Sequence, residues 1–110
     1  NDVHIHPYVE IGENNFLWSG TTLSHHVKVG SNSWFTSSSM VAGNTKIGDC
    51  CFFGLGSIIT NNLTLGNSCF VGAGALVSKN LANDSVVVRS GDDIHRLSSS
   101  HFVKLIKNNF

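Results

Sequence analysis

The chain has 110 residues and a formal net charge of zero, with seven basic and seven acidic side chains. This length suits a single domain, and the balanced charge leaves no electrostatic footprint for a nucleic acid or an anionic membrane surface. No stretch reaches the roughly 18 apolar residues of a membrane span, and no signal peptide opens the chain, so we expect a cytoplasmic protein that binds a small molecule or another copy of itself.

The most regular feature is a six-residue repeat that covers residues 5 to 82. Each of its thirteen hexads opens with a large apolar residue: Ile5, Ile11, Leu17, Leu23, Val29, Phe35, Val41, Ile47, Phe53, Ile59, Leu65, Val71 and Val77. A small residue, such as Thr21 or Ser33, usually stands two positions before the next opener. This pattern predicts a short strand and a bend in every hexad, which is typical of a parallel β-helix.

Three hexads to a triangular coil would place residues that are three hexads apart one above another, in about four coils. Of the thirteen residues that stand fourth in their hexads, eight are Asn or Gly, the residue types that most readily adopt a positive φ. These positions are therefore predicted to form the corners of the coils. We expect residues 1 to 90 to form one β-helix domain.

The hexads end after Ala82, and the rest of the chain changes character. Residues 85 to 89 predict one more strand. In the tail, residues 91 to 110, the segment from 100 to 107 places Phe102, Leu105 and Ile106 on one helical face, which predicts a short amphipathic helix that caps the open end of the solenoid. The chain is already in repeat register at Ile5 without an initiator Met, which is consistent with a piece of a longer polypeptide.

The three cysteines, Cys50, Cys51 and Cys69, form no metal-binding CxxC pattern. Cys51 and Cys69 both occupy the small inward position, three hexads apart, so we expect them to stack on successive coils. A disulfide is geometrically allowed there. Two reduced thiols that act as small core residues are the favoured interpretation.

Of six histidines, only His25 and His26 lie inside the repeat at a corner. His26 falls at the predicted positive-φ position, where imidazole side chains are well tolerated, so it can be read as a turn residue. His25 shares its column with Gly43, Asn61 and Lys79, and that column gives no structural reason for an imidazole. His25 is therefore the stronger candidate for chemistry.

Three segments resemble the left-handed β-helix acyltransferases: residues 23–30 (Leu-Ser-His-His-Val-Lys-Val-Gly), 40–48 (Met-Val-Ala-Gly-Asn-Thr-Lys-Ile-Gly) and 69–77 (Cys-Phe-Val-Gly-Ala-Gly-Ala-Leu-Val). The similarity is closest to the sialic acid O-acetyltransferases and nucleotide-amino-sugar N-acetyltransferases, and it covers about residues 3 to 90. It implies a left-handed all-β solenoid, acetyl-CoA as co-substrate without a metal, a sugar or nucleotide-sugar acceptor, and a homotrimer.

The resemblance also implies roles for particular residues. His25 corresponds to the general base, and the backbone N–H of Gly43, three hexads later, to the donor that binds the oxyanion. The pantetheine arm would run along the same column, past Gly43 and Asn61 toward Lys79, with Arg89 also near the phosphates. Gly54 and Gly72 would allow close contact between the backbone and the cofactor. His26, Trp18 and Trp34 would contact the acceptor.

The chain departs from the family pattern in two ways. Family members often carry an acidic residue after the catalytic histidine, and here that residue is His26. The sugar-binding N-terminal domain of the relatives is also absent from the sequence. A non-catalytic trimeric scaffold, or a fragment of a larger sugar-modifying enzyme, is therefore the alternative interpretation. A zinc site of the γ-carbonic anhydrase type needs a histidine pair about five residues apart, which adjacent His25 and His26 do not provide.

Overall fold

The structure is a computed structural model that describes residues 2 to 89. Within that range the chain forms fourteen strands of two residues each and no helix. They are β1 (His4–Ile5), β2 (Glu10–Ile11), β3 (Phe16–Leu17), β4 (Thr22–Leu23), β5 (Lys28–Val29), β6 (Trp34–Phe35), β7 (Met40–Val41), β8 (Lys46–Ile47), β9 (Phe52–Phe53), β10 (Ile58–Ile59), β11 (Thr64–Leu65), β12 (Phe70–Val71), β13 (Leu76–Val77) and β14 (Val86–Val87). The helix predicted for residues 100 to 107 and the tail from 91 to 110 lie outside the described residues.

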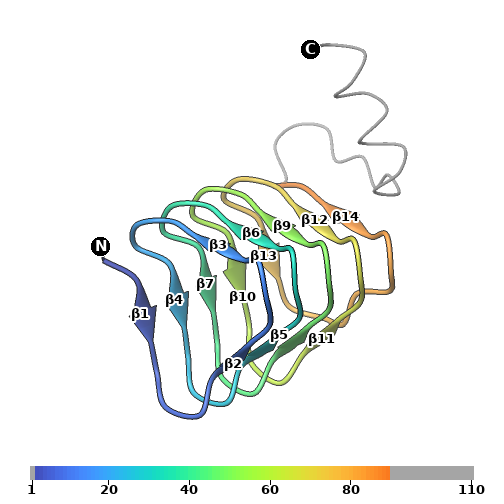
Figure 1. The fold of residues 1–110 in the computed structure, drawn as a ribbon. Helices are drawn as coiled ribbons and strands as arrows, with labels where there is room; N and C mark the ends of the chain where they lie inside the picture. The colour runs from blue at the N-terminus through green and yellow to red at the C-terminus, as the bar shows by residue number, and fades with distance from the viewer. Residues whose placement is uncertain (1, 90–110) are drawn as a thin grey trace.

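The strands form three parallel sheets that wrap into a triangular prism (Figure 1). Sheet A has the order β1-β4-β7-β10-β13, sheet B the order β11-β8-β5-β2, and sheet C the order β14-β12-β9-β6-β3. Paired residues are three hexads apart, as in the pairing of Ile5 with Leu23 and of Leu23 with Val41. The predicted left-handed parallel β-helix is thus confirmed, with about five turns where about four were expected.

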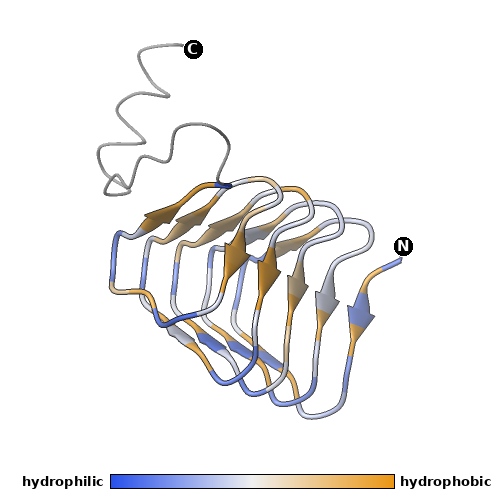
Figure 2. Ribbon diagram, turned by 180° about the vertical axis from the view of Figure 1, so that it is seen from behind, coloured by the Kyte–Doolittle hydropathy of each residue, from blue (hydrophilic) through white to orange (hydrophobic). Residues whose placement is uncertain are grey.

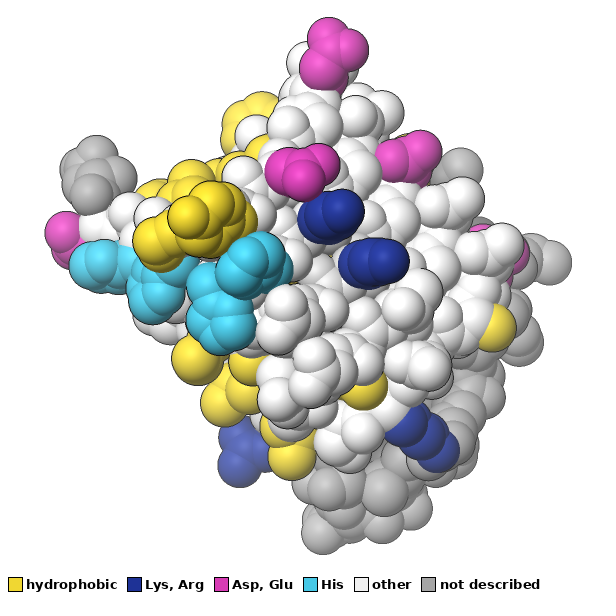
Figure 3. Space-filling view, turned by 90° about the horizontal axis from the view of Figure 1, so that it is seen from below, with side chains coloured by type: hydrophobic (Ala, Val, Ile, Leu, Met, Phe, Trp, Pro, Cys, Tyr) yellow, Lys and Arg dark blue, Asp and Glu magenta, His cyan; other side chains and the backbone are white. Residues whose placement is uncertain are grey.

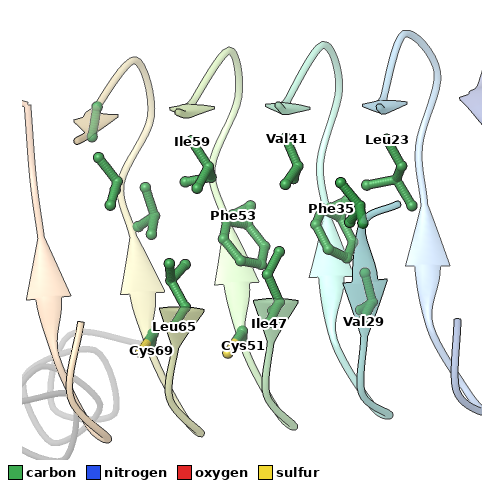
Figure 4. Packing of buried hydrophobic residues seen from close by; sticks show 14 residues of the cluster. Leu23, Val29, Phe35, Val41, Ile47, Cys51, Phe53, Ile59, Leu65 and Cys69 are labelled. Atoms are coloured by element: carbon green, nitrogen blue, oxygen red, sulfur yellow. The ribbon is translucent and has the colours of Figure 1, made fainter. Parts of the chain in front are cut away.

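The hexad openers point into the prism and stack along its axis (Figure 4). Phe35 and Phe53 are fully buried, and their rings stack at a centroid distance of 4.5 Å. Cys51 and Cys69 are buried free thiols beside this stack, which confirms their prediction as small core residues. The interaction of the two thiols, together with burial, raises the pKa of Cys51, and the same interaction lowers the pKa of Cys69 to about 7.

The corner prediction holds for twelve of the thirteen fourth positions. Those with positive φ are Tyr8, Asn14, Gly20, His26, Asn32, Ser38, Asn44, Cys50, Gly56, Asn62, Ser68 and Gly74. The exception is Asn80, and Asp84 has a positive φ instead. The three columns of corner residues, which begin with Tyr8, Asn14 and Gly20, therefore keep the predicted spacing as far as Gly74.

The exception arises because the repeat is shorter after Val77 than the hexad pattern predicts. Leu81 pairs with Leu65, and the Thr64 N–H donates to the Asn80 side chain, both across 16 residues and so less than three full hexads. The prediction of hexads continuing to residue 82 was therefore wrong. The physical reason is visible in the sequence: an uninterrupted repeat would turn the polar Asn83 inward, whereas the shortened corner turns Leu81 inward.

The corner between sheets B and C contains a ladder of hydrogen bonds that sequence reasoning did not find. Each side-chain oxygen accepts a hydrogen bond from the backbone N–H one coil earlier. The Ser31 N–H donates to the Asp49 side chain, and the Asp49 N–H donates to the Asn67 side chain, both at 2.8 Å. A glycine precedes each of Ser31, Asp49 and Asn67, and a Cβ on Gly30 or Gly48 would collide with the ladder oxygen of the next coil. These glycines are thus required by packing.

This close packing predicts that Gly48→Ala lowers the free energy of unfolding by about 1–3 kcal/mol, since the new methyl group must push aside Asn67 and the Gly66 backbone. Denaturant unfolding would measure the change. Gly72→Ala is the matched control, because a Cβ at Gly72 meets Val88 at an ordinary 3.5 Å. We expect the control to change stability by less than about 0.5 kcal/mol. Equal losses in the two variants would contradict the role of the ladder.

The three outer faces differ in polarity (Figure 2). Sheet B presents Glu10, Lys28 and Lys46, and Lys28 pairs with Glu10 at 3.8 Å. Sheets A and C are apolar over much of their length, with exposed side chains at Phe16, Trp34, Met40, Ile58 and Leu76. Within residues 2 to 89 no helix is long and apolar enough to cross a membrane.

Candidate active site

His25 and His26 lie at the corner where the chain leaves sheet A and enters sheet B, between β4 and β5. The flanking residues Ser24 and Val27 are buried, so the corner is anchored on both sides. The two histidines are exposed, and the positive φ of 61° at His26 turns the chain between the sheets. Histidine side chains gather at one edge of the lysine-bearing face (Figure 3).

The ring of His25 lies directly against Gly43 in the next coil. A Cβ built on Gly43 would stand 2.6 Å from both Nε2 and Cε1 of His25, so a side chain at this position would force the imidazole to move. The Asn44 N–H donates to the His25 carbonyl at 3.0 Å, so the two corners are also joined through the backbone. The predicted stacking of these two residues is therefore present, and the glycine leaves room for the imidazole in this position.

The backbone N–H of Gly43 donates no hydrogen bond within residues 2 to 89. The N–H groups of its neighbours Ala42 and Asn44 donate to Ile59 and His25, while the Gly43 carbonyl accepts from Asn62. This N–H can therefore donate to a ligand, and it stands beside an exposed imidazole on a residue without a side chain. The pair thus combines a proton acceptor with a free donor, which are the two groups that direct acyl transfer needs.

His26 is held by two aromatic contacts. Its ring stacks on Tyr8 of the preceding coil, with centroids 4.9 Å apart and an interplanar angle of 15°. Its Nδ1 lies 3.2 Å from Nδ1 of His25. Tyr8 was not among the predicted site residues, although it precedes His26 by three hexads in the same corner column, and that spacing was the signal that could have found it.

The predicted cofactor residues fall on two different edges of the prism. Gly43 and Asn61 follow His25 along the edge between sheets A and B, and Lys79 lies in the shortened corner at the end of that edge. Gly54, Gly72 and Arg89 lie on the edge between sheets C and A. The Arg89 side chain there covers Gly74, whose Cβ would stand 3.2 Å from Cδ of Arg89. One straight track cannot contact all six residues within one chain.

The glycines on the edge between sheets C and A have different reasons to lack a side chain. A Cβ on Gly54 would come within 2.5 Å of the Ala73 backbone nitrogen, so packing between coils already accounts for Gly54. A Cβ on Gly72 would meet only ordinary contacts, and one on Gly56 would meet nothing within 4 Å. A side chain would therefore fit at Gly72, whereas the positive φ of 66° at Gly56 accounts for the glycine there.

The two tryptophans lie away from His25. Trp34 points outward from sheet C, where Phe16 stacks on it at 4.4 Å. Trp18 follows β3 at the corner between sheets C and A, with its ring 6.4 Å from that of Trp34. Sheet C is the face opposite the corner that holds His25 (Figure 1). In one chain, the tryptophans therefore do not flank the histidine.

No family model and no curated protein sequence matches this chain. Solved structures do match it. Serine acetyltransferase from Neisseria gonorrhoeae has a TM-score of 0.75 at 21% identity, over 88% of this chain and 40% of that protein. The acetyltransferase domain of PglB from the same organism has a TM-score of 0.66 at 20% identity, over 87% and 55%. A point mutant of AntD, an N-acyltransferase from Bacillus cereus solved with dTDP and coenzyme A, has a TM-score of 0.65 at 14% identity, over 99% and 84%.

These similarities show that the fold is that of the β-solenoid acyltransferases. The chain spans only about half or less of the serine acetyltransferase and PglB structures that it matches. The identities are too low for residue roles to be carried over from these proteins.

Proposed function

We propose that this chain is an acyltransferase that moves an acetyl group from acetyl-CoA to an amine or hydroxyl of a sugar or nucleotide-linked sugar. The observation that carries the proposal is the placement of the exposed His25 ring against Gly43, whose N–H donates no hydrogen bond within residues 2 to 89. The likeness in fold to proteins named as acetyltransferases supports the same activity. AntD was solved with a nucleoside diphosphate and coenzyme A, which supports a nucleotide-linked acceptor.

In the proposed reaction, Nε2 of His25 takes a proton from the acceptor amine or hydroxyl as that group attacks the acetyl carbonyl. The Gly43 N–H donates to the oxygen that becomes negatively charged. Collapse of the tetrahedral intermediate breaks the bond between carbon and sulfur, and the imidazolium of His25 returns its proton to the leaving thiolate. No protein nucleophile is consumed, so correct placement of the two substrates supplies much of the rate.

The two edges of the prism can serve one site if neighbouring copies assemble side by side. One copy would provide His25, Gly43 and Asn61, and its neighbour would present the edge that carries Gly72, Arg89 and Trp18. Lys79 and Arg89 would then contact the phosphates of coenzyme A from two subunits. A homotrimer closes such head-to-tail contacts, and it would cover the exposed apolar side chains of sheets A and C. Acetyl-CoA and reduced thiols both fit a cytoplasmic location.

The proposed activity is tested by mixing the protein with acetyl-CoA and a panel of nucleotide amino sugars, sialic acid and serine, and then measuring free thiol. We expect one sugar class to release thiol in proportion to acetylated product. Thiol release with serine alone would support acyl transfer but contradict a sugar acceptor. No release above the acceptor-free rate with any compound would favour the non-catalytic scaffold.

Assembly is a separate prediction. Sedimentation at micromolar concentration should give a trimer, about three times the 11.8 kDa mass of the chain. Trp34→Glu places a carboxylate in the apolar surface of sheet C and should shift the equilibrium towards monomer, because a buried unpaired charge is costly. Lys46→Glu on the polar sheet B is the matched control and should leave the trimer intact. A monomeric wild-type protein would contradict both the trimer and the shared site.

A further inference from the structure

The contact between His25 and His26 has a definite chemical meaning, because it joins two like atoms. Nδ1 of His25 lies 3.2 Å from Nδ1 of His26, and the rings meet edge-on at 86°. A hydrogen bond between two ring nitrogens needs one protonated donor and one unprotonated acceptor. One proton, and only one, can therefore lie between the two rings.

The proposed reaction decides which ring donates. Nδ1 of His25 is engaged with His26, and Nε2 lies on the ring edge next to Gly43, so Nε2 is the nitrogen that can take a proton from the acceptor. A neutral imidazole with Nε2 free carries its proton on Nδ1. His25 must then donate from Nδ1, and His26 must accept at its own Nδ1 and carry its proton on Nε2.

His26 is well placed to act as a fixed acceptor. Its backbone N–H donates to the Pro7 carbonyl at 3.2 Å, and its ring stacks on Tyr8. These contacts come from the preceding coil, so three successive coils meet here: Tyr8 holds His26, His26 contacts His25, and His25 lies against Gly43. This order of contacts explains why residue 26 is a histidine, since the turn alone requires only a residue that tolerates a positive φ.

We propose that His26 is a positioning residue that accepts the Nδ1–H of His25 and thereby keeps Nε2 of His25, which lies beside Gly43, unprotonated. The proposal rests on the proposed acetyl transfer for its catalytic consequence. It assigns to His26 a role on His25 in place of contact with the acceptor. Tyr8 acts one step further away, by orienting the ring of His26.

The test is the tautomer of His25, read by long-range 1H–15N NMR on the labelled protein at neutral pH. In wild type we expect His25 to be protonated on Nδ1 and His26 on Nε2. His26→Gly keeps the positive φ and removes the acceptor, so His25 should become a mixture of tautomers. His26→Asp supplies an acceptor again and should restore the Nδ1–H form. Asn44→Gly, the same change one coil further on, should leave the His25 tautomer unaltered.

Turnover provides the second readout. His26→Gly should lower kcat at least about tenfold with the KM for acetyl-CoA unchanged, and His26→Asp should recover most of the loss. A His25 ring protonated on Nε2 in wild type, or an unchanged His25 tautomer in His26→Gly, would overturn the proposal. Because the NMR readout does not need turnover, a protein that shows the expected tautomers but transfers no acetyl group would refute the proposed function alone.

Discussion

Replacing His25 with alanine should reduce acetyl transfer by about 10²–10⁴-fold and leave the affinity for acetyl-CoA nearly unchanged. A general base contributes to the transition state by accepting a proton and contributes little to ground-state binding. The ring is exposed and lies outside the core of the prism, so the variant should remain folded. Initial rates of thiol release at saturating acetyl-CoA, with calorimetric titration of acetyl-CoA, would measure the two effects separately.

His4→Ala is the matched control for this experiment. His4 is an exposed histidine on sheet A whose ring makes no contact with the corner at Gly43 among the interactions of residues 2 to 89. The control should keep nearly full activity. His26→Asn, which retains a residue tolerant of positive φ, should lose less activity than His25→Ala. If His26→Asn lost more than His25→Ala, the general base would have to be His26.

Gly43→Val should lower both acetyl-CoA affinity and turnover. The new side chain would occupy the space of the His25 ring, whose Nε2 would stand 2.6 Å from the added Cβ, and would also obstruct the approach of a thioester to the Gly43 N–H. Loss of an oxyanion donor alone typically costs about 10²–10³-fold in kcat. We expect at least this loss, measured as kcat together with the dissociation constant for acetyl-CoA.

The control for Gly43→Val must separate misfolding from loss of the site. Thermal unfolding of the variant, compared with Gly72→Ala, shows whether the solenoid is intact. Unchanged acetyl-CoA affinity in a folded Gly43→Val protein would mean that the cofactor lies along another edge.

Lys79→Ala should weaken acetyl-CoA binding by about 1–2 kcal/mol with little change in kcat. Titration of the variant with a CoA analogue that lacks the 3′-phosphate would show which phosphate Lys79 contacts.

The hexad pattern predicted the fold in detail because every coil before the last corner obeys the same physical rule. One large apolar side chain and one small side chain enter the prism per hexad, and a residue that tolerates positive φ turns each corner. The stacking of His25 on Gly43 followed from the same arithmetic. The rule failed at Lys79 and Asn80, where the last corner is shorter than a full hexad and the polarity of Asn83 was the overlooked signal.

Other features of the site depend on where the edges and side chains lie in space, which the repeat alone does not state. Counting by three hexads places His25 above Gly43, but it gives no rotamer, so the contact between His25 and His26 could not be predicted. The separation of Gly72 from the edge of Asn61, by contrast, follows from the same count, because residues 61 and 72 are not a multiple of three hexads apart. This consequence of the repeat was overlooked when the cofactor residues were predicted.

The most direct test of the account is where acetyl-CoA binds on the prism. Amide 1H–15N resonances of the labelled protein, followed during titration with acetyl-CoA, report on each corner separately. We predict the largest shifts at Gly43 and Asn61, on the edge between sheets A and B, with little change at Gly30 and Gly48 on the edge between sheets B and C. Shifts confined to Gly30 and Gly48, or no shifts at saturating acetyl-CoA, would contradict the proposed site at His25 and Gly43.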